Sequence, residues 1–156
     1  MDFRNMRRSN KEIFDENIVE ILETAEFGVM SVMGENGYPY GIPLNFVYLD
    51  GAIYFHCADE GHKLDAIKAD NRVSFSVVSG TEIVQQKFTS LYSSVIVFGK
   101  AYITTGEEKT KALRGLIYKY SPDFIDEGMK YVDRKADGTV IVKIDIEHMS
   151  GKSSFR

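Results

Sequence analysis

Short turn signals divide the first half of this chain, and they restrict it to strands that pair with their neighbours in the sequence. Asn36-Gly37 and Asp50-Gly51 each stand between runs of apolar and aromatic residues. Such dipeptides favour the positive φ angles of tight turns, because glycine has no Cβ atom. Strands joined by tight turns run antiparallel, so the sequence predicts an antiparallel meander.

Hydrophobic alternation predicts about six strands in all. Pro39 and Pro43 lie within the second of them and cannot donate to a strand ladder. The early part of that strand is therefore expected to be an edge, a bulge or a place where something other than a strand docks. The expected strands cover residues 27–33, 38–49, 52–57, 72–79, 92–104 and 140–147.

Three or four helices are expected between these strands. Asp15 is the predicted N-cap of the first, in which apolar residues recur at three- and four-residue spacing. A second helix is predicted over residues 63–69. Thr105 and Glu108 form a capping-box pattern for a third, and a short fourth helix is expected around residues 123–129.

Two segments carry no clear pattern. Residues 80–91 are expected to be a less regular connection, either an ordinary surface loop or a lid that contacts a partner. Residues 1–14 are polar and read as an N-terminal extension. Within it, Arg7 and Arg8 fit a solvated tail.

Long strands need closed or covered edges, and a small barrel provides both. The predicted fold is therefore mainly β, an antiparallel β-barrel with peripheral helices. The chain has 156 residues and 44% hydrophobic composition, which suits one domain over residues 1–156.

The charge balance and the single cysteine limit the partners and the compartment. Nineteen basic residues against 23 acidic ones give a net charge of −4, which argues against nucleic acid as a partner. No apolar run approaches the roughly 20 residues needed to cross a bilayer, so no membrane association is expected. Cys57 alone cannot form an internal disulfide. The expected location is the reducing cytoplasm.

The stretch 53–67 carries the clearest chemical signal. An apolar strand ends there at a polar loop, and Gly61 opens a short helix whose first residues are His62 and Lys63. A helix start presents free N–H groups and positive potential, so it suits a phosphate. The alternative is a solvated helix start. The chain shows neither a P-loop nor a Gly-x-Gly-x-x-Gly fingerprint, which argues against a nucleoside triphosphate or a Rossmann-type dinucleotide.

A metal site is considered because His56, Cys57, Asp59 and His62 crowd together. Adjacent side chains in a strand point to opposite faces, so His56 and Cys57 cannot easily ligate one ion or act as a nucleophile pair. No metal is therefore predicted, and Cys57 is interpreted as a small buried hydrophobe.

Four segments, taken together and in order, resemble the flavin-binding split-barrel superfamily of pyridoxamine-5′-phosphate oxidase, most closely its nitroimidazole-resistance (Nim) branch. They are 37–46 (GYPYGIPLNF), 53–67, 92–99 (YSSVIVFG) and Ser150-Gly151-Lys152. The resemblance implies a six-stranded FMN-binding split barrel. It also implies a homodimer with FMN held in grooves between the subunits.

The resemblance further implies which residues hold FMN. They fall into four groups along the chain: Pro43, Leu44 and Asn45 beside the flavin ring; Ala58, Gly61, His62, Lys63 and Leu64 at the phosphate; Ser94, Val95 and Ile96 reaching the ring across the interface; and Ser150, Gly151 and Lys152 beside the flavin. Against Lys152 stands the interpretation of a solvated tail.

His56 matches a histidine that lies near the flavin in Nim relatives, so it is the implied catalytic residue. It would orient or protonate the acceptor, and its ordinary pKa near 6.5 permits this at neutral pH. A satisfied core histidine is the alternative. The resulting hypothesis is an FMN-dependent oxidoreductase that takes electrons from NAD(P)H or a reduced protein. It would pass them to a small acceptor such as a nitroaromatic or a quinone.

Departures from the oxidase members weaken one part of the resemblance. The basic phosphate grip of those enzymes is reduced here to His62-Lys63, and their C-terminal substrate motif is not visible. Pyridoxamine-phosphate oxidase-like catalysis is therefore kept as an alternative. A non-catalytic flavin- or haem-binding protein is the other.

Overall fold

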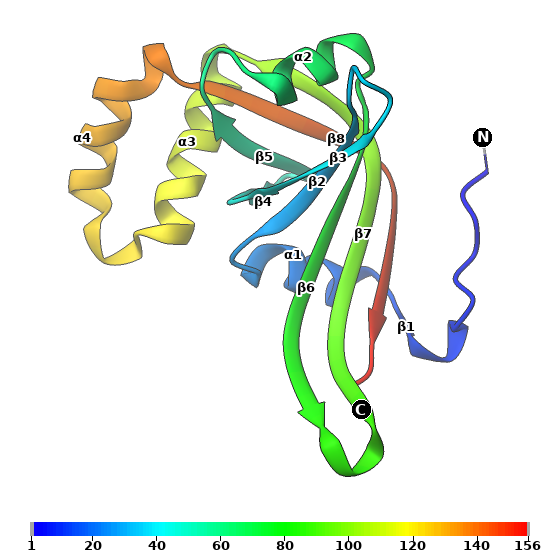
Figure 1. Ribbon diagram of the computed structural model, residues 1–156. Coiled ribbons are helices and arrows are strands. Elements are labelled where there is room, and N and C mark those ends of the chain that lie inside the picture. Colours follow the sequence, from blue (N-terminus) through cyan, green and yellow to red (C-terminus); the bar gives the residue numbers. More distant parts are fainter. Residues whose placement is uncertain (1, 156) are drawn as a thin grey trace.

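The computed structural model describes residues 2–155, which form one antiparallel sheet with helices around it (Figure 1). The hydrogen-bonded order is β3-β2-β6-β7-β8-β5-β4, and β1 pairs with β8. The strands are β1 (Glu12–Ile13), β2 (Gly28–Met33), β3 (Pro39–Leu44), β4 (Val47–Leu49), β5 (Ala52–Cys57), β6 (Arg72–Val84), β7 (Thr89–Thr104) and β8 (Val140–Ser153). The α-helices are α1 (Asp15–Thr24), α2 (His62–Ala69), α3 (Gly106–Tyr120) and α4 (Ile125–Lys135).

The sheet curls into a barrel. Its two edge strands, β3 and β4, are joined by a short connecting segment and not by hydrogen bonds between strands. β3 and β4 stand at opposite ends of the hydrogen-bonded order, yet only Asn45 and Phe46 separate them in sequence. Three Cα–Cα steps span at most about 11 Å, so the two edges must come together. The predicted antiparallel sheet with peripheral helices is confirmed, with eight strands in the described residues where six were expected.

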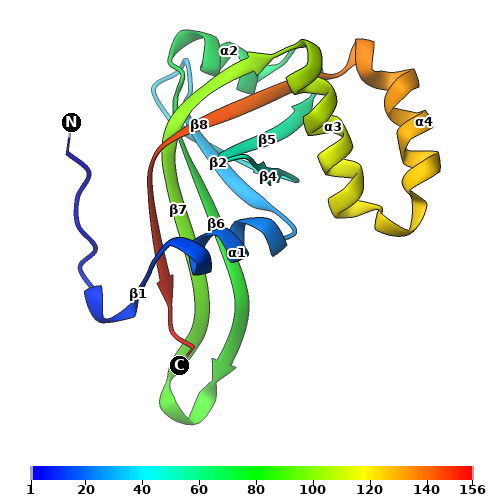
Figure 2. The same cartoon turned by 180° about the vertical axis from the view of Figure 1, so that it is seen from behind.

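Helices α1 and α2 close the barrel at its two ends (Figures 1 and 2). Both contribute to the main hydrophobic core, which also holds the wholly buried Phe46, Phe55 and Phe75. The helix residues in this core are Ile18, Ile21 and Leu22 of α1 and Leu64, Ala66 and Ile67 of α2. The barrel interior is therefore filled by side chains, so a ligand site must lie on its outside.

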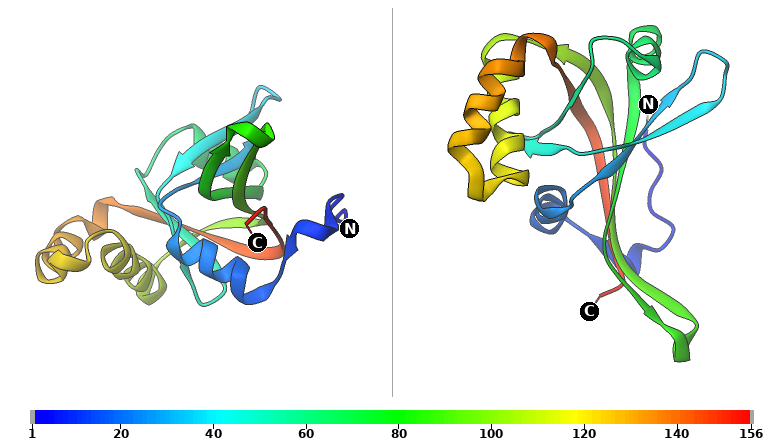
Figure 3. Two further views of the ribbon diagram at one scale, coloured as in Figure 1. Left: turned by 90° about the horizontal axis from the view of Figure 1, so that it is seen from below. Right: turned by 60° about the vertical axis from the view of Figure 1, so that its left-hand side comes forward.

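Helices α3 and α4 cover only part of that outside (Figure 3). A second hydrophobic cluster joins them to β4, β5 and the start of β8, and we call this part the covered half. Its buried members are Val47, Ala52, Tyr54, Ala112, Leu113, Leu116, Val132 and Ile141. No helix packs on the outer face of β3, β2, β6, β7 and the later part of β8 in the described residues, and we call that face the uncovered half. Within residues 2–155 no helix is long and apolar enough to cross a bilayer.

The single strand expected over residues 38–49 is wrong. The structure divides it into β3, which pairs with β2, and β4, which pairs with β5. Two residues between them turn the chain: the Asn45 amide donates to the Glu26 carbonyl at 3.0 Å, and the Phe46 ring is wholly buried. Burial of that ring and the hydrogen bond of Asn45 to Glu26, 19 positions away in the sequence, outweigh continuation of the strand.

The irregular connection expected over residues 80–91 is also wrong. β6 and β7 continue through it as a long hairpin, with a register shift between Ser79 and Glu82 (Figure 1). Phe88 near its tip adopts φ 50° and is 98% exposed, and Ile83 is 76% exposed. The hairpin thus projects apolar side chains beyond the barrel.

Neither expected N-terminal cap forms the side-chain hydrogen bond that was predicted. Asp15 is the first residue of α1, and Phe14 occupies the N-cap position. Thr105 does precede α3, but no side chain caps that helix. Glu108 bonds across to the sheet instead, where stronger partners are available. The helix expected around 123–129 extends to Lys135.

The last strand also extends beyond its expected end. β8 runs through residue 153, so the segment from His148 onward is a strand and not a tail. This continuation matters for function because it brings Ser150 and Lys152 beside β7.

Candidate functional site

The uncovered half aligns side chains from five strands. Register partners give one row that crosses β3, β2, β6, β7 and β8, and a second row lies beside it. Residues that pair directly across neighbouring strands point to the same face of the sheet. Val95 and Val97, which alternate with the row residues of β7, are wholly buried, so both rows lie on the outside of the barrel. The first row is Pro43, Val29, Ser76, Ile96 and Ser150, and the second is Gly41, Ser31, Ser74, Phe98 and His148.

A pocket of about 290 Å³ opens on this face at β7 and β8. Its lining is Arg4, Met6, Ser94, Ile96, Phe98, Ser150 and Lys152. Four of these, Ser94, Ile96, Ser150 and Lys152, are among the predicted cofactor residues. Among the described residues, two cationic side chains and no carboxylate line the pocket, so its electrostatics favour an anionic ligand.

Lys152 is held in place by an aromatic neighbour. Its Nζ donates to the Tyr92 hydroxyl at 2.8 Å and lies 4.7 Å from the centre of the Tyr92 ring. The hydrogen bond and the charge of Lys152 lower the pKa of Tyr92, with smaller contributions from Arg8 and Lys11. Lys152 therefore belongs to a basic neighbourhood and not to a solvated tail.

The N-terminal segment supplies one wall of this pocket, which sequence reasoning missed. The Phe3 ring stacks on His148 at 4.6 Å and 6°, and on Phe98 at 5.3 Å and 25°. Arg4 and Met6 of the same segment line the pocket. These contacts join residues more than 90 positions apart, so no local pattern could have predicted them.

The predicted phosphate segment lies at the start of α2. Gly61 has φ 133°, a conformation that L side chains rarely adopt. The side chain of His62 meets Tyr40 edge-on at 4.6 Å. The N–H of Leu64 already donates to the Gly61 carbonyl, and its side chain is buried in the core. A phosphate here would depend on His62, Lys63 and their backbone N–H groups.

His56 and Cys57 point to opposite sides of β5, as predicted. His56 is exposed, whereas Cys57 is partly buried and packs on the main core. Burial raises the pKa of the Cys57 thiol, while the nearby charge of Lys63 acts in the opposite direction. Within residues 2–155 no three potential metal ligands gather.

Within one chain, His56 lies far from the pocket. It pairs with Ile141, whereas Ile96 pairs with Ser150. Those two positions of β8 are nine residues apart, which corresponds to up to about 30 Å along a strand. The predicted site residues therefore fall into three groups: one in the pocket, one around the end of β5 and the start of α2, and Pro43, Leu44 and Asn45 at the end of β3.

Several predicted site residues point inward and could reach a ligand only through their backbone. Val95 is wholly buried, and Leu44 packs against the main core. Gly151 is buried, and a Cβ there would lie 2.6 Å from Ile18 and 2.7 Å from Ile13. Glycine is therefore required by packing at this position, whatever its role toward a cofactor.

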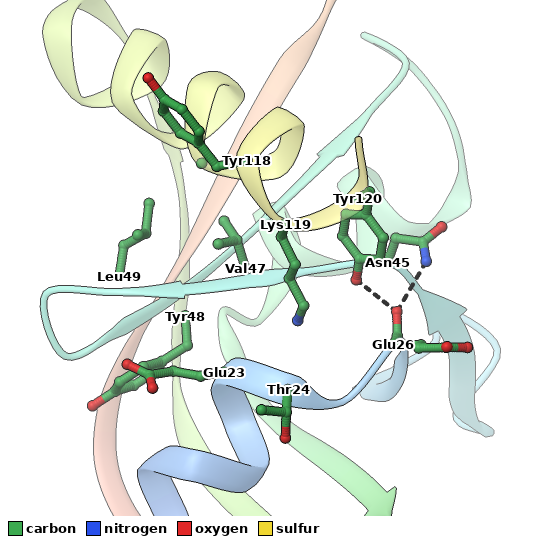
Figure 4. Close-up of a pocket in the computed structure, with 11 residues that line it drawn as sticks. Glu23, Thr24, Glu26, Asn45, Val47, Tyr48, Leu49, Tyr118, Lys119 and Tyr120 are labelled. Carbon is green, nitrogen blue, oxygen red and sulfur yellow. Dashed lines mark hydrogen bonds between the residues drawn. The ribbon is translucent and has the colours of Figure 1, made fainter. Parts of the chain in front are cut away.

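A larger pocket lies between the end of α1, β4 and α3 (Figure 4). In it the Lys119 Nζ donates to the Phe46 carbonyl at 2.9 Å and lies 3.9 Å above the Phe46 ring. Burial lowers the pKa of Lys119 to about 8. The Tyr120 hydroxyl accepts the Phe46 N–H at 3.0 Å and lies 2.6 Å from the Glu26 carbonyl oxygen. These contacts, together with those of Asn45, stabilise the chain where β3 ends and β4 begins.

The polar groups of the covered half bond to one another. Glu108 accepts from Tyr54 at 2.7 Å and pairs with Lys143 at 3.0 Å. Hydrogen bonds from Tyr54, Lys143 and Thr104 lower the pKa of Glu108 to about 2. Burial, followed by the bond to Glu108, raises the pKa of Tyr54 to about 12. These groups serve the contact between α3 and the sheet.

Solved structures with a similar fold include several flavin proteins. A candidate 5-nitroimidazole antibiotic resistance protein from Bacteroides thetaiotaomicron is 25% identical, with a TM-score of 0.74 over 90% of this chain and 85% of that one. A flavocytochrome from Azotobacter vinelandii is 20% identical (TM-score 0.81; 97% and 73% covered). An FAD- and haem-binding protein from Mycobacterium smegmatis is 17% identical (TM-score 0.80; 94% and 74% covered).

The family assignment rests on the sequence as well as on the fold. A search of curated proteins finds no match to this chain. Residues 15–153 match the family described as pyridoxamine 5′-phosphate oxidase. This range includes every strand of the sheet except β1. The curled antiparallel sheet, with its end strands joined by two residues, agrees with the split barrel that this match implies. The chain therefore belongs to the pyridoxamine 5′-phosphate oxidase family.

Proposed function

We propose that this protein is an FMN-dependent oxidoreductase that holds the flavin on the uncovered half of its barrel. The observation that carries the proposal is the pocket at β7 and β8. It gathers Ser94, Ile96, Ser150 and Lys152, which come from two distant parts of the sequence. Membership of the family makes a flavin the ligand to test first.

The residues present fit such a cofactor. A bound flavin would supply the electron-transfer chemistry, and the protein would bind and orient it. Ser94 and Ser150 offer hydroxyl groups, Ile96 an apolar surface and Lys152 a positive charge. His62 and Lys63 would hold the phosphate at the start of α2.

A homodimer with FMN at its interface would bring the separate groups of site residues together. Within one chain His56 lies far from the pocket along β8, so a second copy would be needed to place His56 and the pocket residues on one flavin. The uncovered half also exposes 41% of Ile96, 38% of Phe98 and 57% of Val78. Apolar side chains gathered on one face favour association with a partner.

The proposed reaction moves electrons from a nicotinamide cofactor to a small acceptor such as a nitroaromatic or a quinone. A nitro group that accepts two electrons and two protons becomes a nitroso group and releases water, so the acceptor site needs a proton source. His56, exposed at the end of β5, is the proposed donor or orienting group. The likeness to the candidate nitroimidazole resistance protein supports this class of acceptor.

The experiment is a spectrum followed by a titration. Purified protein with added FMN should show a bound-flavin absorption spectrum, and FAD in a parallel sample tests the choice of flavin. Anaerobic NADH or NADPH should then bleach the flavin band, and a nitroaromatic should restore it. A protein that binds neither flavin overturns the proposal.

A second candidate is a non-catalytic flavin- or haem-binding protein. It is favoured by the likeness in fold to the flavocytochrome and to the FAD- and haem-binding protein. Bound flavin that no nicotinamide bleaches would support this candidate, and a Soret band on adding haemin would point to haem. Oxidation of pyridoxamine 5′-phosphate, a third candidate, is tested by offering that substrate to the flavin-loaded protein.

Two substitutions separate the proposed roles. Lys63→Ala should weaken FMN binding, since it removes a charge from the phosphate segment. His56→Ala should leave FMN bound and lower nitro reduction by about 10²-fold or more, the usual contribution of a positioned acid or base. Unchanged affinity in the first variant, or unchanged turnover in the second, would remove the corresponding role.

A further inference from the structure

The pocket between the end of α1, β4 and α3 contains a lysine that the proposed function does not use (Figure 4). Its volume is about 770 Å³, within the usual range for small-molecule sites. It shares no lining residue with the pocket at β7 and β8. The Lys119 side chain extends from α3 into this space, toward the end of α1. The pocket is therefore separate from the proposed flavin site and contains an amine.

The amine of Lys119 has few partners in the protein. Lys143 pairs with Glu108, whereas Lys119 forms no ion pair within residues 2–155. Its Nζ donates to the Phe46 carbonyl at 2.9 Å and lies 3.9 Å from the centre of the Phe46 ring. A lysine ammonium has three N–H donors, and the described residues accept only one of them.

Burial without a paired carboxylate makes Lys119 a better nucleophile than an ordinary lysine. Burial lowers its pKa to about 8, because the charged form loses contact with water. About half of Lys119 is then the free amine at pH 8, against less than about 1% of an ordinary lysine. The free amine is the form that attacks a carbonyl group.

From these observations we propose that the pocket binds a small aldehyde with an apolar body, held as an imine on Lys119. The Nζ lone pair attacks the carbonyl carbon, and the resulting carbinolamine loses water as a C=N bond replaces the C=O bond. The carbonyl oxygen leaves as that water, and no oxidant or reductant is consumed. The reaction needs no flavin, so this inference goes beyond the proposed function.

The surroundings of Lys119 fit the product. A protonated imine keeps one N–H, which the Phe46 carbonyl accepts, and its positive charge lies over the Phe46 ring. Glu23 and Glu26 also line the pocket, and their carboxylates favour a cation there. Val47 and the ring of Tyr48 line it as well and offer contacts to an apolar body.

The test is reductive trapping at pH 8 with benzaldehyde and, separately, with formaldehyde, which has no apolar body. Sodium cyanoborohydride fixes each imine, and peptide mass spectrometry measures the labelling rate of Lys119 relative to Lys111. Lys111 is an exposed lysine of the same helix. With benzaldehyde we expect Lys119 to react at least about tenfold faster than Lys111, because more of it is free amine. The ratio should be smaller with formaldehyde. Equal ratios for the two aldehydes, or no excess at Lys119, would overturn the proposal.

A matched pair of variants locates the preference for benzaldehyde. Thr24→Trp adds a bulky ring at a residue that lines the pocket, and Glu16→Trp adds the same ring to α1 at a residue that does not line it. The first should reduce the benzaldehyde ratio to the formaldehyde value, and the second should keep it. The same preference in Thr24→Trp as in the unaltered protein would show that the aldehyde does not occupy this pocket.

Discussion

The outer face of the sheet has two halves, and they differ in what packs against them. On the covered half, Leu113 and Leu116 of α3 bury the outer side chains of β5, and Tyr54 is only 6% exposed. On the uncovered half, Ile96 and Phe98 of β7 stay more than a third exposed. The backbone pairing is antiparallel in both. The difference therefore comes from side chains and from where the chain places its helices.

Polar groups differ between the halves in the same way. Glu108, Tyr54 and Lys143 bond to one another where helix meets sheet. In the pocket of the uncovered half, Arg4 and Lys152 are the charged lining residues, and no carboxylate of residues 2–155 lines it with them. A closed set of partners indicates a structural contact, whereas cations gathered without an acidic partner indicate a place for a ligand.

Truncating one apolar side chain in each half gives the largest expected contrast. Leu116→Ala should lower the free energy of unfolding by about 2–5 kcal/mol, because it leaves a cavity in a closed cluster. Ile96→Ala should cost less than about 1 kcal/mol, because its side chain is already partly in water. Urea denaturation at pH 7 and low protein concentration measures both. Equal losses would show that the two halves are not packed differently.

A charge placed on the uncovered half tests whether a second copy covers it. Ile96→Asp should weaken self-association at least about tenfold, because an unpaired carboxylate would be buried in the interface. Tyr131→Asp is the control, since Tyr131 is 53% exposed on α4. Sedimentation velocity over a range of concentrations measures both. A dimer lost in the control and kept in Ile96→Asp would place the interface on the helices.

Acid should affect the covered half through Glu108, with a smaller effect. Its pKa is about 2 in the folded protein and 4.5 ordinarily, so the unfolded state binds the proton more readily. The stability that Glu108 contributes is present above about pH 4.5 and is lost as the pH falls toward 2. Glu108→Gln should flatten this decline in urea midpoints between pH 5 and 2. Parallel curves for the two proteins would show that Glu108 does not cause it.

Local patterns predicted those elements that local chemistry determines. The Asp50-Gly51 turn and the strand over residues 52–57 are where alternation and turn residues placed them. The break between β3 and β4 was not predicted, because Tyr120 on α3 stabilises it from 74 positions away in the sequence. The long hairpin was missed because residues 80–91 alternate weakly and their pairing depends on β6 and β7 continuing past the barrel.

The candidate site shows the same limit. Resemblance indicated Ser94, Ile96, Ser150 and Lys152, and the register of β7 and β8 brings them into one pocket. It could not indicate Phe3 or Arg4, since their position depends on a stack with His148. The basic pair Arg7 and Arg8 was the available signal in this segment, and it was interpreted as a solvated tail.

The central claim is that the uncovered half holds the flavin, and one substitution tests it directly. Ser150→Trp adds a bulky ring to the outer row without entering either hydrophobic core. FMN is titrated into the variant, and its binding is measured by the quenching of its fluorescence. We expect at least tenfold weaker binding than in the unaltered protein, with an unchanged urea midpoint. Binding of FMN to Ser150→Trp with unaltered affinity would contradict the claim, because the flavin would then lie elsewhere.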